Sequence, residues 1–321
     1  MGEFELIDRY FKKPVRHADM GIGDDCALLS AAHGHQLAIS ADMLVEGRHF
    51  LSTVQAAHLG HKALAVNLSD LAACGARPKA FLLALALPRL DADWLQGFST
   101  GLFQLAEQHG CELIGGDTTQ GPLNIAITVL GDVPQGQALL RSGARAGDDL
   151  YVSGTVGDAR LALEAFRGHI SLPEAVFAHA RARMETPTPR VELGMALRGV
   201  ASAAADISDG LLGDLGHILE ASGVGATLDL SVLESLLSCR PLWHCPRELA
   251  HTCILAGGDD YELVFTAPVQ AREQVLAASS RSQTPVTRVG VIRAGSGMEV
   301  LDPQGRPLAR HFASFDHFAA S

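Results

Sequence analysis

Short acidic motifs recur along this chain, each beside glycines, small residues or hydroxyls, and most follow an apolar stretch. This placement predicts that the acids sit where a strand or helix ends and a loop begins. Clustered carboxylates repel one another unless a cation lies between them. Mg²⁺ takes oxygen ligands of this kind and keeps positions free for phosphates. The motifs are 21–25 (GIGDD), 40–42 (SAD), 67–70 (NLSD), 115–119 (GGDTT), 206–210 (DISDG) and 257–260 (GGDD).

Each motif taken alone has an ordinary structural explanation. Asp209 precedes a helical segment and fits a helix N-cap. Asp25 and Asp117 fit tight turns, because an Asp side chain bonds its own backbone there. Caps and turns do not require paired acids beside paired glycines. The recurrence therefore favours a metal- and phosphate-binding site.

Length and charge narrow the classes of protein. A chain of 321 residues is natural for two domains. A formal charge of −11, from 36 acids against 25 Lys and Arg, argues against a nucleic-acid partner, which needs a basic surface. The sequence shows no apolar run long enough for a membrane span and no apolar signal segment at its start. We therefore expect a cytoplasmic protein without a membrane partner.

The six cysteines form no C-x-x-C pair. Five Cys and His residues do gather within a short stretch, but their spacing fits a zinc site poorly. In a cytoplasmic chain we expect small buried thiols. The stretch holds Cys239, His244, Cys245, His251 and Cys253.

Apolar patterning predicts an α/β chain with an α+β sheet domain in its first half. Residues 134–147, rich in Gly, Pro and Gln, are the best linker, so we expect domains at 1–136 and 137–321. The first half reads as helices at 4–11, 56–75 and 91–110, with strands at 36–40, 79–87 and 123–133. The second reads as strands at 149–153, 201–206, 225–230, 261–266, 286–292 and 298–301, with helices at 157–168, 173–184, 190–199 and up to 222.

Familiar nucleotide-binding strings are missing. The chain has no P-loop, no G-x-G-x-x-G and no protein-kinase catalytic-loop string. A bound nucleotide would therefore need a different scaffold.

The ordered strings of this chain resemble those of the thiamine-monophosphate kinases, a family in the aminoimidazole ribonucleotide synthetase-like superfamily. The similarity runs through GIGDDCALL at 21–29, AISAD at 38–42, GRHF at 47–50, KALAVNLSDLAACGA at 62–76, LIGGDTTQGPL at 113–123, RSGA at 141–144, DISDGLLGDLGHI at 206–218, GGDDYEL at 257–263 and FDHF at 315–318. The resemblance implies a two-domain fold and a homodimer in which the N-terminal sheet pairs across the dimer. It also implies Mg²⁺-dependent transfer of the ATP γ-phosphoryl group to thiamine monophosphate, with ATP between the domains.

The resemblance also implies roles for residues that match the family's motifs. No side chain is expected to act as a general base. Metal ligands would be Asp25, Ser40, Ala41, Asp42, Asp70, Asp117, Asp206 and Asp209; ATP contacts would be Gly116, Asp117, Arg141 and Ser208; thiamine-monophosphate contacts would be His49, Asp259 and Phe315.

Three of these positions depart from the family's usual residue. Ala41 stands where many relatives carry Thr, so a metal contact there would use the backbone carbonyl. Asp259 stands where relatives typically have Glu, which shortens the arm by one methylene. Phe315 stands where some relatives place Tyr or Trp, so stacking is kept and a hydrogen bond is lost. Taken alone, His49 fits a structural or surface histidine, Phe315 a core aromatic and Arg141 a solvated linker arginine.

Two other functions remain open at this point. The first is another ATP-dependent enzyme of the superfamily. Selenophosphate synthetases need a reactive Cys near the N-terminus, where this chain offers Cys26, and hydrogenase-maturation relatives need a C-terminal Cys, where this chain ends in Ser321. The second is a non-catalytic module that holds nucleotide or metal, against which the full acidic set argues.

Overall fold

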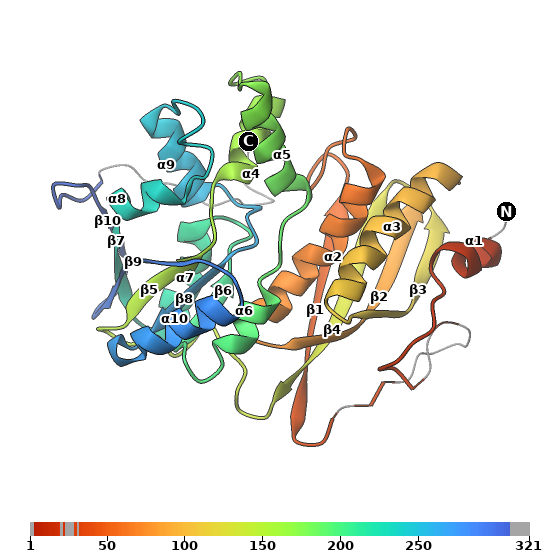
Figure 1. Ribbon diagram of the computed structural model, residues 1–321, viewed down its shortest axis with the longest axis horizontal. Coiled ribbons are helices and arrows are strands. Elements are labelled where there is room, and N and C mark those ends of the chain that lie inside the picture. The colour runs from red at the N-terminus through yellow and green to blue at the C-terminus, as the bar shows by residue number, and fades with distance from the viewer. Residues whose placement is uncertain (1–2, 20–21, 23–28, 31, 309–321) are drawn as a thin grey trace. The chain divides into compact units, whose positions relative to one another are not determined.

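The computed structural model describes residues 3–19, 22, 29–30 and 32–308 (Figure 1). The chain divides into two compact units. The first comprises Met1–Leu71 and Ala76–Ala138, and the second comprises Ala72–Gly75 and Leu139–Ser321. Among the described residues, no helix is both long and apolar enough to cross a membrane.

The first unit is built on a four-stranded sheet in the order β1-β4-β2-β3. β4 runs antiparallel to both of its neighbours, whereas β2 and β3 are parallel. The outer strands are therefore β1 and β3. The elements are α1 (Glu3–Tyr10), β1 (His35–Val45), α2 (Ala56–Ala73), β2 (Arg77–Leu87), α3 (Ala92–Gln108), β3 (Glu112–Gln120) and β4 (Asn124–Pro134).

Helices α2 and α3 pack closely beside each other (Figure 1). A Cβ on Gly60 would lie 2.0 Å from the Phe98 carbonyl oxygen, and a Cβ on Gly101 would lie 1.8 Å from that of Ala57. Only glycine permits this approach of the two backbones. The pair can therefore cover one face of the sheet as a compact layer.

The two faces of this sheet differ in burial. Alternate side chains of β2, such as Phe81 and Leu83, are buried on the face that the helices cover. On the opposite face Ile39 is 62% exposed, Met43 55% and Leu82 36%. Among the described residues of this chain, none covers this apolar sheet face.

The second unit has a six-stranded sheet in the order β10-β7-β9-β5-β8-β6, antiparallel except where β10 meets β7. Its aliphatic core includes residues of α4, α5, α7 and α9. The elements are β5 (Asp149–Ser153), α4 (Asp158–Phe166), α5 (Glu174–Glu185), α6 (Val191–Ala196), β6 (Ala203–Asp206), α7 (Leu211–Ser222), β7 (Gly225–Asp229), α8 (Leu230–Leu233), η1 (Glu234–Leu236), α9 (Arg247–Ala256), β8 (Leu263–Ala267), η2 (Val269–Ala271), α10 (Arg272–Arg281), β9 (Val286–Arg293) and β10 (Met298–Leu301).

The prediction that the acidic motifs follow the ends of elements is wrong for three motifs of the first unit. Asp42 lies inside β1, Asp70 inside α2 and Asp117 inside β3. β1 continues to Val45 because β4 pairs with it as far as Asn124. A partner strand distant in sequence sets this length, so local composition did not reveal it.

Candidate functional site

The first group of predicted ligands lies where α2 contacts β1. Ser40, Asp42 and Leu44 are every second residue of β1, so their side chains project to the same side of the sheet. Leu44 is buried there. The Ser40 hydroxyl donates to a carboxylate oxygen of Asp70 on α2 at 2.5 Å. The backbone N–H of Asp42 donates to the Asn67 amide oxygen at 3.1 Å. This donor set consists of oxygens and fits Mg²⁺.

Ala41 lies between the two β1 ligands but belongs to the other side of the strand. Its side chain is exposed, and strand alternation directs it to the open face. A methyl group binds no cation, so Ala41 can offer only its backbone carbonyl.

Asp117 and Gly116 lie on the opposite outer strand. In the sheet register Asp42 is paired with Ile127 of β4, and Ile127 with Leu83 of β2. Leu83 is paired in turn with Gly116. Asp42 and Gly116 are therefore three strands apart in the sheet. At about 4.8 Å for each strand spacing, their backbones are separated by roughly 14 Å. Within one chain's sheet, Asp117 and Asp42 are too far apart to hold the same ion.

Gly116 is required by a close backbone approach. Its φ is +150°, and a Cβ there would lie 1.9 Å from the Leu83 carbonyl oxygen. Glycine therefore lets β3 come close to β2 beside Asp117, whose side chain is exposed.

His49 lies in the turn that follows β1, and its ring and its backbone both have partners. Its Nδ1 accepts the N–H of Val45 at 3.0 Å, so a neutral ring carries its proton on Nε2. Its carbonyl accepts a hydrogen bond from Lys62 of α2 at 3.2 Å. These contacts hold the imidazole ring of His49, which the family resemblance predicts to contact the substrate.

In the second unit two acidic loops pair with each other. The loop 206–210 begins at Asp206, the last residue of β6, as the sequence predicted. Its Ser208 carbonyl accepts the N–H of Asp259 at 2.7 Å, and its Ile207 carbonyl accepts that of Tyr261 at 2.9 Å. The segment that carries Asp206, Ser208 and Asp209 is thereby joined to the 257–261 segment.

Asp214, which the sequence analysis did not single out, holds the first of these loops in shape. Its carboxylate accepts the backbone N–H groups of Ser208, Asp209 and Gly210, each at 3.1 Å. Burial, and next the charge of Asp209, raise the pKa of Asp214 to about 7 against the effect of these three donors. The N-cap of α7 is Gly210, so the interpretation of Asp209 as the helix cap is wrong.

Asp259 adopts a left-handed backbone conformation, with φ of +64°. Asp tolerates this region better than most residues because its short polar side chain can hydrogen-bond to the nearby backbone. The structure thus offers a physical reason for a short acid here. Strained residues of this kind concentrate at functional sites.

Arg141 begins a loop that is fixed at its backbone. The Ser222 hydroxyl, at the end of α7, donates to the Arg141 carbonyl at 3.2 Å. The same hydroxyl accepts the N–H groups of Gly143 and Ala144 at 3.1 and 3.2 Å. The Arg141 side chain is exposed, as a contact to a phosphate requires.

Glu262 is a further residue that the sequence analysis missed. It is fully buried and is bound by the guanidinium groups of Arg183 and Arg190. The Ser153 hydroxyl also donates to it at 2.7 Å. This pairing anchors the chain three residues after Asp259.

Two predicted residues, Asp25 and Phe315, lie outside the described residues. Their expected roles in metal and thiamine-monophosphate binding stay predictions.

The three thiols of the cysteine-rich stretch are buried, as expected: Cys239, Cys245 and Cys253 are at most 9% exposed. One ligand atom each from Asp158, His179 and Cys239 lie within 4.8 Å of one another. Hydrogen bonds account for this group. Asp158 accepts the N–H groups of Ser238 and Cys239, and the Ser238 hydroxyl contacts both Asp158 and His179.

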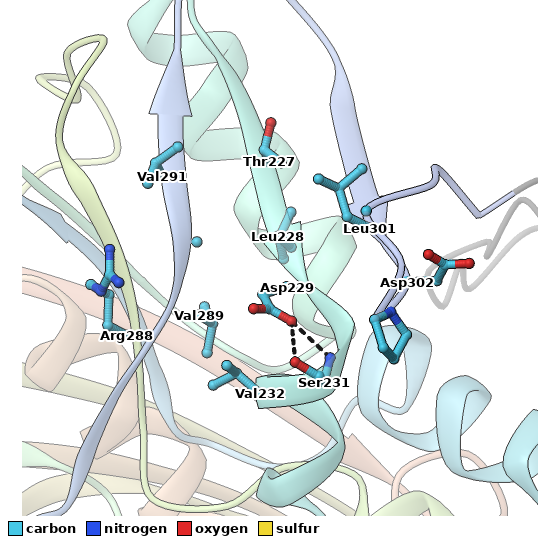
Figure 2. Close-up of a pocket in the computed structure, with 13 residues that line it drawn as sticks. Thr227, Leu228, Asp229, Ser231, Val232, Arg288, Val289, Val291, Leu301 and Asp302 are labelled. Carbon is cyan, nitrogen blue, oxygen red and sulfur yellow. Dashed lines mark hydrogen bonds between the residues drawn. The ribbon is translucent and has the colours of Figure 1, made fainter.

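A surface recess of about 380 Å³ lies in the second unit. Figure 2 shows Asp229 on its wall, where the carboxylate accepts from Ser231, with Arg288 and Asp302 on either side. The recess includes none of the predicted site residues.

Comparison with known proteins places the chain among related sequences. Residues 23–133 match the model of the AIR synthase related protein N-terminal domain. Residues 145–302 match that of the AIR synthase related protein C-terminal domain. Both halves therefore match one family in order.

Three relatives are similar over nearly their whole length. The thiamine-monophosphate kinase of Salmonella typhimurium is 45% identical over 99% of this chain and 98% of its own. The crystal structure of thiamine-monophosphate kinase from Stenotrophomonas maltophilia is 44% identical, covers 96% of this chain and 98% of its own, and has a TM-score of 0.85. The structure of AaThiL complexed with AMPPCP and TMP is 29% identical over 99% and 97%, with a TM-score of 0.74.

Proposed function

The chain belongs to the AIR synthase related family and, within it, to the thiamine-monophosphate kinases, and from this premise we propose how its residues serve the reaction. The γ-phosphoryl group of ATP passes to thiamine monophosphate, which gives thiamine diphosphate and ADP. ATP is the co-substrate and thiamine monophosphate the acceptor.

The acceptor chemistry explains why no side chain is needed as a base. A phosphate monoester has a second pKa near 6 and is mostly a dianion at neutral pH. The obstacle is the repulsion between two polyanions, about 4 kcal/mol for each pair of unit charges at 4 Å and an effective dielectric of 20. Phosphoryl transfer therefore depends on positioning and on charge neutralisation.

The oxygen donors of this chain fit Mg²⁺. Ser40, Asp42 and Asp70 would hold it in the first unit, and Asp206 and Asp209 in the second; Asp25, Asp117 and the Ala41 carbonyl complete the proposed set. Bound Mg²⁺ ions supply positive charge to the phosphates and fix their oxygens. The observation that carries this proposal is the Ser40–Asp70 contact beside Asp42.

The remaining contacts are proposed from the positions that match the family's motifs. Arg141 presents a guanidinium fork for an ATP phosphate, and Gly116 and Ser208 offer backbone or hydroxyl groups to the nucleotide. His49 and Asp259 bind thiamine monophosphate, and Phe315 stacks on its cationic ring system.

A second copy of this chain is the proposed partner for the open face of the first unit's sheet. Ile39, Met43 and Leu82 leave this apolar face exposed, and water contact with it is unfavourable. β1 and β3, which carry Asp42 and Asp117, are the outer strands. A homodimer through this sheet covers the apolar face that carries Ile39 and Met43.

The cytoplasm is the proposed location. The described cysteines are free thiols: Cys74, Cys111, Cys239, Cys245 and Cys253. A reducing compartment keeps them in that state.

An acceptor panel tests the function. Purified protein with ATP and Mg²⁺ is given thiamine monophosphate, thiamine, aminoimidazole-type substrates or selenide, and ADP is measured. We expect ADP formation with thiamine monophosphate alone. ADP formation with another acceptor instead would favour a different enzyme of the superfamily. Nucleotide binding without ADP in any case would favour a binding module.

A further inference from the structure

Helix α2 contacts β1 and the turn after it at three successive points. Asp70 meets Ser40, Asn67 meets Asp42, and Lys62 meets His49. The residue numbers fall along the helix as they rise along the strand, so the two elements run in opposite directions. Each contact ends on a residue that the proposed function uses. Of the three helix residues, only Asp70 has been given a role in that function.

Asn67 is held at both ends of its amide. Its side chain is buried, at 1% exposure. Nδ2 donates to the Ala63 carbonyl at 3.0 Å, one helical turn earlier, and Oδ1 accepts from the Asp42 N–H at 3.1 Å. β1 is an outer strand, in which alternate N–H groups point away from the neighbouring strand. Asn67 satisfies one of them and so fixes the backbone that carries the Asp42 carboxylate.

Lys62 is an unusually buried lysine, at 2% exposure. Burial of an ammonium group is costly unless its protons find acceptors. Its Nζ donates to the His49 carbonyl at 3.2 Å. Because the His49 ring also accepts from Val45, both the main chain and the ring of His49 are held.

We propose that Asn67 and Lys62 are positioning residues, with separate effects. Asn67 sets the metal-binding geometry through Asp42, and Lys62 sets thiamine-monophosphate binding through His49. This inference rests on the proposed function. Outer partners that orient a metal ligand typically change metal affinity by 10- to 100-fold when removed. Loss of one hydrogen bond that orients a substrate contact changes binding by about 2- to 12-fold.

The test compares Asn67→Leu, Lys62→Met and Val66→Ala. Leu and Met fill similar space without the polar groups. Val66, also buried on α2, provides a matched control for loss of stability alone. Mn²⁺ binding is titrated by electron paramagnetic resonance without nucleotide. The kcat and both KM values are measured at saturating Mg²⁺, together with the Tm.

We expect Asn67→Leu to weaken Mn²⁺ binding by about 10- to 100-fold with little change in the thiamine-monophosphate KM. We expect Lys62→Met to raise that KM by about 2- to 12-fold with Mn²⁺ binding kept. Val66→Ala should lower the Tm and change neither. If either polar variant fails to fold, Asn67→Ala or Lys62→Leu is measured in its place.

Unaltered Mn²⁺ affinity in the Asn67 variant, or an unaltered KM in the Lys62 variant, would overturn the corresponding half of the inference. If the two residues had only a structural role, both polar variants would have a lower Tm, and neither would change Mn²⁺ affinity or the thiamine-monophosphate KM selectively. Measurements on the wild-type protein distinguish failure of this inference from failure of the proposed function. If the wild type binds no Mn²⁺ and makes no thiamine diphosphate, both the proposed function and the inference that rests on it are wrong.

Discussion

Ser40 and Asp70 meet at 2.5 Å across the contact between an outer strand and the helix that covers it. They are separated by 30 positions in sequence, so the contact exists only in the folded unit. It brings a hydroxyl and a carboxylate to the same face as Asp42. Both groups are oxygen donors, as the proposed Mg²⁺ site requires.

Asp70→Asn should reduce turnover by orders of magnitude while the fold stays intact. The change removes one charged oxygen ligand but keeps the size of the side chain and an acceptor for Ser40. Turnover and circular dichroism are the measurements. Asp93→Asn, an equal loss of charge at an exposed position of α3, is the control and should keep full activity. Near-normal turnover in folded Asp70→Asn would refute the metal site.

Asp259→Gly should separate the backbone role of this residue from its substrate contact. Glycine adopts a φ of +64° without strain, so the Tm should hold or rise slightly. Loss of a charged hydrogen-bonding group should raise the thiamine-monophosphate KM by about 10- to 100-fold and leave the ATP KM unchanged. If the KM for thiamine monophosphate is unchanged, Asp259 serves only the turn.

The exposed sheet face predicts a dimer of twice the 33.8 kDa chain mass. Light scattering at micromolar concentration should give that mass for the wild type. Ile39→Lys places a charge on the apolar face and should shift the mass toward the monomer. Leu276→Lys, at an exposed apolar position of α10, is the matched control and should stay dimeric. A wild-type monomer would contradict the proposed assembly.

Asp149 should make the second unit sensitive to acid. Hydrogen bonds from Arg272, and then from Arg288, hold the pKa of this carboxyl below its usual range despite burial. A depressed folded-state pKa means that the stabilisation is present above the ordinary Asp pKa. It is lost as the pH falls through the lower folded value.

The measurement is the difference in Tm between the wild type and Asp149→Asn across pH. Both arginines are about half exposed, which weakens their ion pairs with Asp149. We therefore expect Asp149→Asn to lower the free energy of unfolding by roughly 1–3 kcal/mol at neutral pH. The difference should shrink below about pH 4. A difference that is the same at all pH values would show that charge plays no part.

Local signals in the sequence predicted local features. A helix was expected from residue 91, and α3 is capped there by Asp91, whose carboxylate accepts the Trp94 N–H at 3.1 Å. The strand that ends at Asp206 is equally well predicted. Such features depend on neighbouring residues, which the sequence shows directly.

Features that depend on distant partners were missed. The extension of β1 beyond Ser40 depends on β4, some 80 positions later. Asn67, Lys62 and Asp214 act through contacts with backbone groups, and sequence motifs do not show which backbone a side chain will reach. A polar residue within an otherwise apolar helical stretch, such as Lys62 or Asn67 in KALAVNL at 62–68, is a sequence signal that could have found two of them.

Transfer of label from ATP to thiamine monophosphate tests the central claim most directly. The protein is incubated with γ-³²P-labelled ATP, Mg²⁺ and thiamine monophosphate, and the products are separated. The account predicts labelled thiamine diphosphate in the wild type, its loss with EDTA, and its near-absence in Asp42→Asn. Label that appears only as inorganic phosphate, or label transfer that survives in folded Asp42→Asn, would contradict it.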